Sequence, residues 1–442
     1  MTSGVALPGS TINYTFTGLD RGATYYGWAV AAQQGYASDV MTSTPAYLAT
    51  DPYTFFNSGL LTFMRASVAT RVNAAGLIET VPVDTARLDH NPVTLAQKGL
   101  LIEESRTNVI LRSESIGSTG WQVFNSTMNA NADVSPSGSL TATRIVANTA
   151  NVDHIARQPV TLGSTKTSTL SCFAKAAGQN FCRLRLIINA SYYTDFYVDL
   201  RTGVATSVPV GFVVKASYAT AFPGGWYRCV TTIENGSITT GVNCVVDIAG
   251  APSLGAVGYV GDNTSGILLW GAQLEEGPFV TSYIPTTTAA VTRAGDFASI
   301  EGNNFSSWYN PAEGTFGAQF QTMFATDSIP RYILTGNSNQ LMYLAANTGT
   351  ITSFDGQVPA LSGSASAFGV LAKAYLGYSA SGRSLTARGA NATTSSTAQN
   401  FSGMTSLRIG HLMNAVPFCG WIRSIVYYPT RLTDAQLKAL SA

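Results

Sequence analysis

Charged side chains are scarce in this sequence. Asp, Glu, Lys and Arg make up 11% of the 442 residues, less than half of the roughly 25% that is usual in globular proteins. The formal net charge is +1 and no run of Lys or Arg occurs. The chain therefore has no electrostatic footprint for nucleic acid or anionic lipid, and both are excluded as partners.

Long apolar runs are also missing. No stretch approaches the roughly 18 consecutive apolar residues of a transmembrane helix. The first residues show no basic segment followed by an apolar one, which is the pattern of a secretory signal peptide. We therefore expect no membrane insertion.

Cysteine is rare, and no two cysteines are spaced as a C-x-x-C pair. This spacing argues against a zinc site and against a dense disulfide framework. We expect buried free thiols, with one or two bridges in the middle of the chain as the alternative. The cysteines are Cys172, Cys182, Cys229, Cys244 and Cys419.

Histidine and metal-binding patterns give no catalytic or metal centre. His90, His154 and His411 lie in different segments, and their spacing suggests no nucleophile, base and orienting group. No loop has EF-hand spacing, so no cofactor is expected. Calcium binding is the alternative, because turn residues such as Asp262 and Asn263 could supply oxygen ligands.

Ser, Thr, Asn and Gly take the place of charge, beside ample apolar (45%) and aromatic (10%) residues. Alternating apolar and polar residues, broken by turn clusters every 8 to 12 residues or so, predict an all-β chain of tandem sandwiches. One short C-terminal helix is expected at residues 433–440. There Thr433 and Gln436 have capping-box spacing, and Leu437 and Leu440 can pack back on a sheet.

Residues 12–46 resemble the second half of a fibronectin type III domain. The resemblance rests on Leu19 and on Tyr25, placed as in a tyrosine corner, while Arg21 and Ala23 stand where that family has Pro and Thr. It implies a partial sandwich over residues 1–50. Its missing strands would come from upstream residues or another chain, so we expect residues 1–50 to be an attachment segment.

Leu61 to Asn108 resembles a segment recurrent in bacteriophage tail-fibre, head-spike and prophage structural proteins, with Met64 where Thr is commoner. The resemblance implies a virion structural protein in which residues 51–98 form a connector. Its motifs are Arg65-Ala66-Ser67, Ala69-Thr70, Gly76-Leu77-Ile78, Arg87-Leu88-Asp89-His90 and Gly99 through Asn108.

Two further segments resemble β-sandwich families. Residues 99–293 look like the jelly roll that accompanies the phage segment and resembles carbohydrate-binding modules, with landmarks at Leu170–Lys175, Gly224–Arg228 and Leu268–Gly277. Residues 294–442 look like a concanavalin-like or laminin-G-like lectin domain. Its landmarks are Trp308-Tyr309-Asn310, Leu407–Gly410 and Trp421–Tyr428.

Sugar binding needs aromatic faces with amide and carboxylate groups around them. We assign this role to Trp121 in the loop at residues 120–124, and to Tyr192, Tyr193 and Asp195 after a turn. Asp195 is also a candidate calcium ligand. The alternative for these side chains is core packing or trimer contact. The tryptophans Trp226, Trp270 and Trp421 are assigned to cores, and Trp308 stays ambiguous.

The sequence predicts that the chain is not an enzyme. Glycoside hydrolysis needs two carboxyl groups facing one cleft, and the adjacent pairs Glu103-Glu104 and Glu275-Glu276 lie in extended segments where neighbours point to opposite faces. At most one residue of each pair can face a site, and the simpler reading is a strand residue beside a solvated charge.

The resulting hypothesis is a subunit of a bacteriophage appendage, a tail fibre or spike, that recognises host-surface polysaccharide. The resemblance implies a homotrimer, localisation in the virion after synthesis in the host cytoplasm, and contact with other virion proteins through the N-terminal segment. Two alternatives remain: an architectural collar, neck or head fibre protein that binds only virion proteins, and a capsule-degrading enzyme.

Overall fold

The computed structural model describes residues 59–442 with nine gaps, at 164–166, 190–191, 235–241, 325–327, 338–339, 355–359, 368, 398–400 and 402. Before residue 59 it describes five two-residue strands: β1 (Trp28–Ala29), β2 (Ala32–Gln33), β3 (Tyr36–Ala37), β4 (Met41–Thr42) and β5 (Tyr47–Leu48). The partial fibronectin-like unit predicted over residues 1–50 otherwise lies outside the described residues. The described chain is nearly all β and antiparallel, which confirms the predicted fold class.

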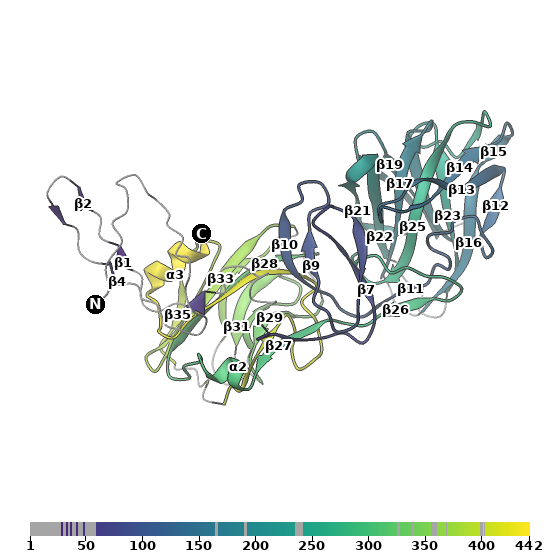
Figure 1. Cartoon of the computed structure of the whole chain (residues 1–442). Coiled ribbons are helices and arrows are strands. Elements are labelled where there is room, and N and C mark those ends of the chain that lie inside the picture. Colours follow the sequence, from purple (N-terminus) through teal and green to yellow (C-terminus); the bar gives the residue numbers. More distant parts are fainter. Residues whose placement is uncertain are drawn as a thin grey trace.

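One β-sandwich lies within residues 109–286, and we call it the inserted sandwich (Figure 1). Its first sheet has the order β12 (Gln122–Phe124), β16 (Ile155–Leu162), β23 (Val242–Ala251), β18 (Phe181–Asn189), β19 (Tyr192–Asp199), β20 (Ala205–Val210). Its second has the order β13 (Ser126–Val134), β14 (Leu140–Ala147), β25 (Gly266–Glu276), β17 (Thr167–Ala177), β22 (Trp226–Glu234), β21 (Val213–Phe222). A small ladder of β15 (Asn151–Asp153) and β24 (Gly258–Val260) is paired beside them.

A second sandwich combines residues 61–102 with residues 297–442, and we call it the split sandwich. One sheet has the order β35 (Thr393–Ser395), β34 (Gly382–Ala387), β33 (Ala372–Ser379), β28 (Gly314–Thr322), β37 (Gly420–Tyr428), β10 (Gln97–Ile102), β9 (Leu88–His90), and β5 also pairs with β37. The other has the order β32 (Leu361–Ala365), β31 (Thr350–Phe354), β30 (Gln340–Leu344), β29 (Arg331–Thr335), β36 (Ser406–Ile409), β27 (Phe297–Glu301), β6 (Thr62–Met64).

The sheets do not divide at the predicted boundaries after residues 98 and 293. β10 pairs with β37, with Leu100 opposite Ile422, and β6 pairs with β27, with Phe63 opposite Ala298. Strands of the predicted connector and of the predicted jelly roll therefore complete the last sandwich, and the other sandwich is inserted between them. The physical reason is burial, since Leu100, Leu101 and Ile102 belong to the split-sandwich core.

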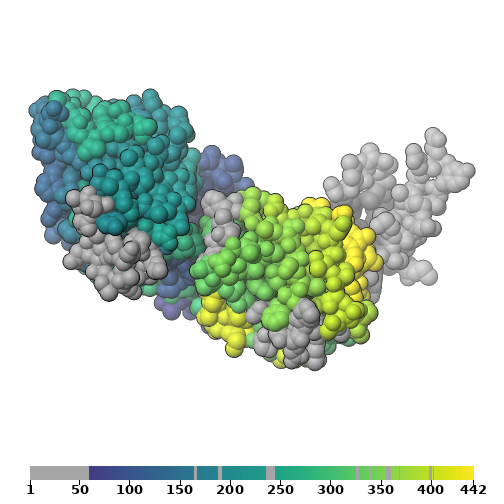
Figure 2. Space-filling view, turned by 180° about the vertical axis from the view of Figure 1, so that it is seen from behind, coloured from purple at the N-terminus to yellow at the C-terminus, as the bar shows by residue number. Residues whose placement is uncertain are grey.

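The two sandwiches are joined where the chain enters and leaves the insertion. β11 (Arg106–Asn108) and β26 (Val291–Arg293) pair antiparallel at this point. The hairpin of β7 (Ala69–Val72) and β8 (Ile78–Val81) packs its Ile78 into an aromatic cluster with Phe173 and Trp270 of the inserted sandwich. Figure 2 shows the resulting two lobes with the early strands between them.

A buried ion cluster lies at the same junction. Asp296 pairs with Arg65 at 3.2 Å and also with Arg87, while Glu103 pairs with Arg87 at 2.8 Å and lies 3.5 Å from Arg293. All five side chains are at most 1% exposed. The arginines of the phage-like motifs therefore serve the junction, and three guanidinium groups face two carboxylates there.

The predicted helix is confirmed as α3 (Asp434–Ser441). Thr433 caps it, and Gln436 closes the capping box from the other side. Leu437 is buried in a small cluster with Leu432 and Tyr375. The sequence missed a four-residue helix, α2 (Asn303–Ser306), and a single 3-10 turn at Pro223–Gly225, because neither is long enough to show helical periodicity.

All five cysteines are free and buried. No helix among the described residues is long and apolar enough to cross a membrane.

Candidate functional site in the cleft between the sandwiches

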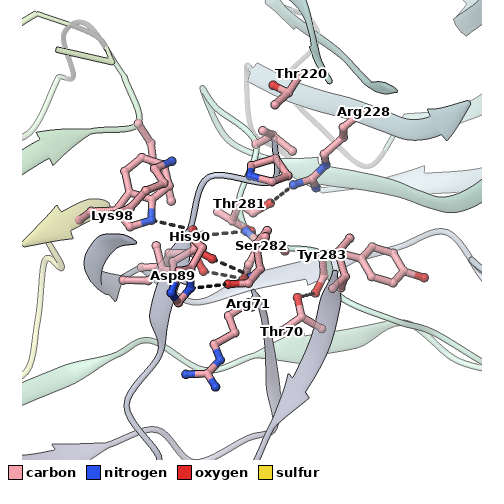
Figure 3. Close-up of a pocket in the computed structure, with 18 of the residues that line it drawn as sticks. Thr70, Arg71, Asp89, His90, Lys98, Thr220, Arg228, Thr281, Ser282 and Tyr283 are labelled. Atoms are coloured by element: carbon pink, nitrogen blue, oxygen red, sulfur yellow. Dashed lines mark hydrogen bonds between the residues drawn. The ribbon is translucent and has the colours of Figure 1, made fainter. Parts of the chain in front are cut away.

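A cleft of about 240 Å³ opens where the two sandwiches meet (Figure 3). The split sandwich contributes Asp89 and His90 from β9, Lys98 from β10 and Trp421 from β37. The inserted sandwich contributes side chains of β21 and β22, among them Tyr218, Thr220, Phe222 and Arg228. The segment 280–283, which follows β25, forms part of the wall.

Asp89 is held in the wall by two donors. The backbone N–H of Val72 donates to one carboxylate oxygen at 2.7 Å, and the indole N–H of Trp421 donates to the other at 2.8 Å. Burial raises the pKa of Asp89, and Lys98 together with the two donors opposes this. The hydrogen bonds orient Asp89 and fix the edge of the Trp421 ring at the cleft.

Lys98 lies over the face of the same ring. Its Nζ is 3.0 Å from the centroid of the Trp421 ring, a cation–π arrangement. Burial lowers the pKa of Lys98 to about 8, although Asp89 and Glu103 act in the opposite direction. The ammonium is therefore a charged group with a reduced hydration shell at the cleft.

Arg228 occupies the opposite wall on β22. It donates to the carbonyl oxygen of Thr281 at 2.8 Å and to the hydroxyl of Ser171 at 3.3 Å, and it lies over the ring of Phe173. Burial lowers the pKa of Arg228. Burial also raises the pKa of the neighbouring Tyr218 to about 12, so its hydroxyl stays protonated at neutral pH.

The ion cluster supports the floor of this cleft. Glu103 accepts hydrogen bonds from the backbone N–H and the hydroxyl of Ser282, both at 2.6 Å. Arg293 and Arg87 outweigh the effect of burial and lower the pKa of Glu103 to about 2. In the same segment Thr281 donates from its N–H and hydroxyl to Glu275. The wall at 281–283 is thus fixed by two buried carboxylates.

Both Glu pairs follow the strand rule, with one buried member each. Glu103 and Glu275 are fully buried, while Glu104 is 20% exposed and is paired with Arg331 at 2.6 Å. The predicted solvated charge is therefore an ion-paired residue in the case of Glu104. His90, for which the sequence suggests no catalytic role, has its Nδ1 3.3 Å from the carbonyl oxygen of Val72.

The residues that the sequence assigned to sugar binding do not form one site. Trp121 is 7% exposed and belongs to the core of the inserted sandwich, so its ring is unavailable for stacking. It precedes β12, which is four strand positions from β19, or roughly 19 Å at a strand spacing of about 4.8 Å. Tyr192 packs partly against the same core.

Tyr193 and Asp195 lie on the outer face of the first sheet of the inserted sandwich. Asp195 forms a two-point ion pair with Arg185, with both distances 2.6 Å, and the ring of Tyr193 lies beside the same guanidinium. The row continues across the sheet to Asp247 and Arg157, which pair at 2.7 and 2.8 Å. We call Arg157, Asp247, Arg185 and Asp195 the charge ladder.

The assignments of the tryptophans hold in part. Trp226 and Trp270 are core residues, 2% and 1% exposed. Trp421 packs against the split-sandwich core and also lines the cleft. No sequence signal links Trp421 to Lys98 and Asp89, because they meet only through the pairing of β37, β10 and β9.

The calcium alternative finds no support in the geometry. Within the described ranges no group of three His, Cys, Asp or Glu side chains is placed to hold a metal ion. Asp262 accepts hydrogen bonds from the N–H groups of Thr264 and Ser265 and from the Ser265 hydroxyl, which lower its pKa. Asp195 is taken up by Arg185.

No protein-family model matches the chain, and no curated protein matches it. Solved structures that it is similar to include domains LG4-5 of the mouse laminin alpha1 chain, at 11% identity and a TM-score of 0.21, covering 64% of this chain and 90% of that one. A proposed carbohydrate-binding protein from Bacteroides ovatus has 12% identity, a TM-score of 0.27 and coverages of 66% and 80%. Both TM-scores lie below 0.5, so these similarities carry no argument about this chain.

The comparisons also correct one prediction. The sequence predicts that the chain is not an enzyme, whereas its structural neighbours include Trypanosoma rangeli sialidase, which is an enzyme. That prediction is contradicted and is not retained. The sialidase match has 11% identity and a TM-score of 0.27 and covers 68% of this chain and 60% of that one. It assigns no reaction to this chain.

Proposed function

We propose that this protein binds a glycan in the cleft between its two sandwiches. The observation that carries the proposal is the convergence of both sandwiches on one cleft lined by apolar rings and by polar groups held in fixed orientations. Small-molecule sites have this composition, with hydrophobic walls and a few convergent polar groups that select the ligand.

The lining suits a pyranose ring. Trp421 and Val280, which are partly exposed, offer apolar surface for the C–H face of a sugar, and the Thr220 hydroxyl and the carbonyl oxygen of the Gln321 amide offer hydrogen bonds to its hydroxyls. The volume of about 240 Å³ lies just below the range of roughly 300 to 1,000 Å³ typical for small-molecule sites. The cleft therefore suits one or two sugar units, such as a chain end.

The wider role that we propose is host-surface recognition by a bacteriophage appendage. Its support is the sequence resemblance of residues 61–108 to phage structural proteins. Localisation in the virion, a homotrimeric assembly and attachment through residues 1–50 belong to the same proposal and rest on the same resemblance. Repeated copies in one particle would multiply a modest affinity at each cleft.

The test is a glycan array probed with the full chain and with two variants on one strand. Thr220 and Val213 both lie on β21 and are exposed, but only Thr220 lines the cleft. Thr220→Trp should fill the cleft and lower the affinity for any bound glycan at least tenfold, whereas Val213→Trp should leave it unchanged. Silence of the wild-type chain on host polysaccharides, with tight binding to a particle protein, would favour the architectural alternative instead.

Hydrolysis of the bound glycan is a second candidate function, and one observation favours it. Asp89 and Glu103 both line the cleft, and their pKa values are shifted in opposite directions, up for Asp89 and down to about 2 for Glu103. Glycoside hydrolysis uses two carboxyl groups whose environments hold their pKa values apart. Glu103 is itself fully buried and ion-paired with Arg87 and Arg293, so Asp89 is the group that the test addresses. Release of reducing sugar that is lost in Asp89→Asn would support it. Bound glycan recovered intact would reject it.

A further inference from the structure

Two positive charges at the cleft are not neutralised by ion pairs. The other charged side chains of the lining have partners: Arg71 pairs with Glu79 at 2.6 Å, and Glu103 pairs with Arg87 and Arg293. Both carboxylate oxygens of Asp89 accept neutral N–H donors, so one negative charge also remains at the cleft beside the two positive ones. Lys98 and Arg228, one from each sandwich, remain without an ion-pair partner among the residues that the structure describes.

The ammonium of Lys98 lacks an acceptor. Within the described part of the chain its one direct interaction is with the ring of Trp421, and it forms no hydrogen bond. Asp89 on β9 and Glu103 after β10 attract it through space without contact. An ammonium has three N–H donors, and an anionic ligand in the cleft can accept hydrogen bonds from them in place of water.

Arg228 makes hydrogen bonds to neutral oxygens alone, those of Thr281 and Ser171. Its Nε is buried without an acceptor in the described structure. The carboxylate with the largest electrostatic effect on Arg228 is Glu275, whose oxygens accept hydrogen bonds from Thr281 and Gln273. A guanidinium with spare donors at the wall of a cleft is suited to an oxyanion.

The ion cluster adds further positive charge near the cleft. It places the three guanidinium groups of Arg65, Arg87 and Arg293 against the two carboxylates of Glu103 and Asp296, which leaves one positive charge over. The cluster lies below the wall formed by residues 281–283, because Ser282 bonds directly to Glu103. A low-dielectric surrounding strengthens the attraction of this excess charge for an anion in the cleft.

We infer that the glycan bound in the cleft is an acidic one, whose anionic group contacts Lys98 and Arg228 while its ring packs on the apolar wall. This inference rests on the proposed glycan-binding function and names its substrate class. The anionic group is a carboxylate, as in a uronic acid, or a sulfate ester. The two share the chemistry that Lys98 and Arg228 recognise.

The experiment compares matched pairs of oligosaccharides on the full chain by calorimetry. One pair is an oligogalacturonate and its carboxyl-reduced form, and the other is a sulfated galactan fragment and its desulfated form. We expect one acidic member to bind at least tenfold more tightly than its neutral counterpart. Lys98→Gln should remove that difference, and Lys98→Arg, which keeps the charge, should retain most of it.

The control removes a positive charge from strand β21 outside the cleft. Lys215 lies on β21, is about half exposed and pairs with Glu234, so Lys215→Gln should leave the preference for the acidic sugar unchanged. Circular dichroism of each variant excludes loss of folding as the cause. Arg228→Lys provides a second variant from the opposite wall and should reduce the preference by about tenfold or more.

Each outcome decides between the two claims. Equal binding of acidic and neutral members, blocked by Thr220→Trp, overturns the inference and leaves the glycan-binding function standing. A preference for the acidic member that survives both Lys98→Gln and Arg228→Lys also overturns it, because the charge would be recognised elsewhere. Absence of binding to every oligosaccharide overturns both. Preference for one pair alone identifies the anionic group.

Discussion

The charge ladder and the cleft both contain basic side chains, but within the described chain these are all ion-paired on the ladder, whereas two of those in the cleft are not. On the ladder each arginine meets a carboxylate in the next strand, with Arg157 paired to Asp247 and Arg185 to Asp195. In the cleft Lys98 and Arg228 lie at the surface of two sandwiches without such partners among the described residues. Paired charges are satisfied inside the molecule, so they hold the sheet together. Charges left without a partner have binding capacity for a ligand.

The ion cluster belongs with the ladder in this comparison, and breaking it should give the largest effect. Asp296→Asn removes a carboxylate shared by three buried arginines. Loss of one partner from a buried ion pair costs about 3 to 5 kcal/mol, which corresponds to a fall of roughly 10 °C in the thermal unfolding midpoint. Scanning calorimetry of the variant measures it.

The matched control is Asp199→Asn, which breaks the ion pair between Asp199 and the exposed Arg201. Surface pairs contribute little, so its midpoint should be nearly that of the wild type. If Asp296→Asn unfolds at the wild-type midpoint too, the cluster does not hold the two sandwiches together.

Acid should weaken the same cluster in a defined pH window. The pKa of Glu103 is about 2 in the folded chain, lower than its ordinary value of 4.5 because Arg293 and Arg87 favour the carboxylate. A lowered carboxyl pKa contributes stability that is fully present above about pH 4.5 and is lost as the pH falls toward 2. The difference is worth about 3 kcal/mol, and urea unfolding at a series of pH values measures it.

Glu103→Gln separates this effect from general acid denaturation. The amide has no charge to lose, so the variant should be less stable at neutral pH and should lose less stability than the wild type between pH 4.5 and 2. Parallel pH curves for the two proteins would contradict the assignment to Glu103.

Ligand affinity at the cleft should change with pH in the alkaline range. Burial lowers the pKa of Lys98 to about 8, so above that pH the free protein carries a neutral amine facing the ligand. If Lys98 recognises an anion, affinity for the acidic glycan should fall up to tenfold per pH unit above about 8. Calorimetry from pH 7 to 9.5 measures this, and Lys98→Arg should flatten the curve because arginine stays charged.

The sequence predicted those parts of the molecule that depend on neighbouring residues. The α3 cap is set by Thr433 and Gln436, three positions apart, and alternation within single strands is enough to show an all-β chain. The split of the last sandwich was not predictable from the sequence. The apolar pattern of β10 is the same whether the strand pairs with the next segment or with β37, which lies more than 300 residues later. The cleft could not be predicted from the sequence for the same reason, because Lys98 and Trp421 are neighbours only in the folded chain.

The smallest effect is expected at the site that the sequence proposed. Tyr193→Ala removes an aromatic ring from the ladder face, where it lies 5.5 Å from the Arg185 guanidinium. Because that guanidinium remains bound to Asp195 at two points, the ladder should persist, and stability should fall by about 1 kcal/mol or less. Glycan affinity should stay within twofold of the wild type on the same array that detects Thr220→Trp. A tenfold loss in Tyr193→Ala would move the binding site to the outer face of the inserted sandwich, and the contrast between paired and unpaired charges would then fail as a guide to function.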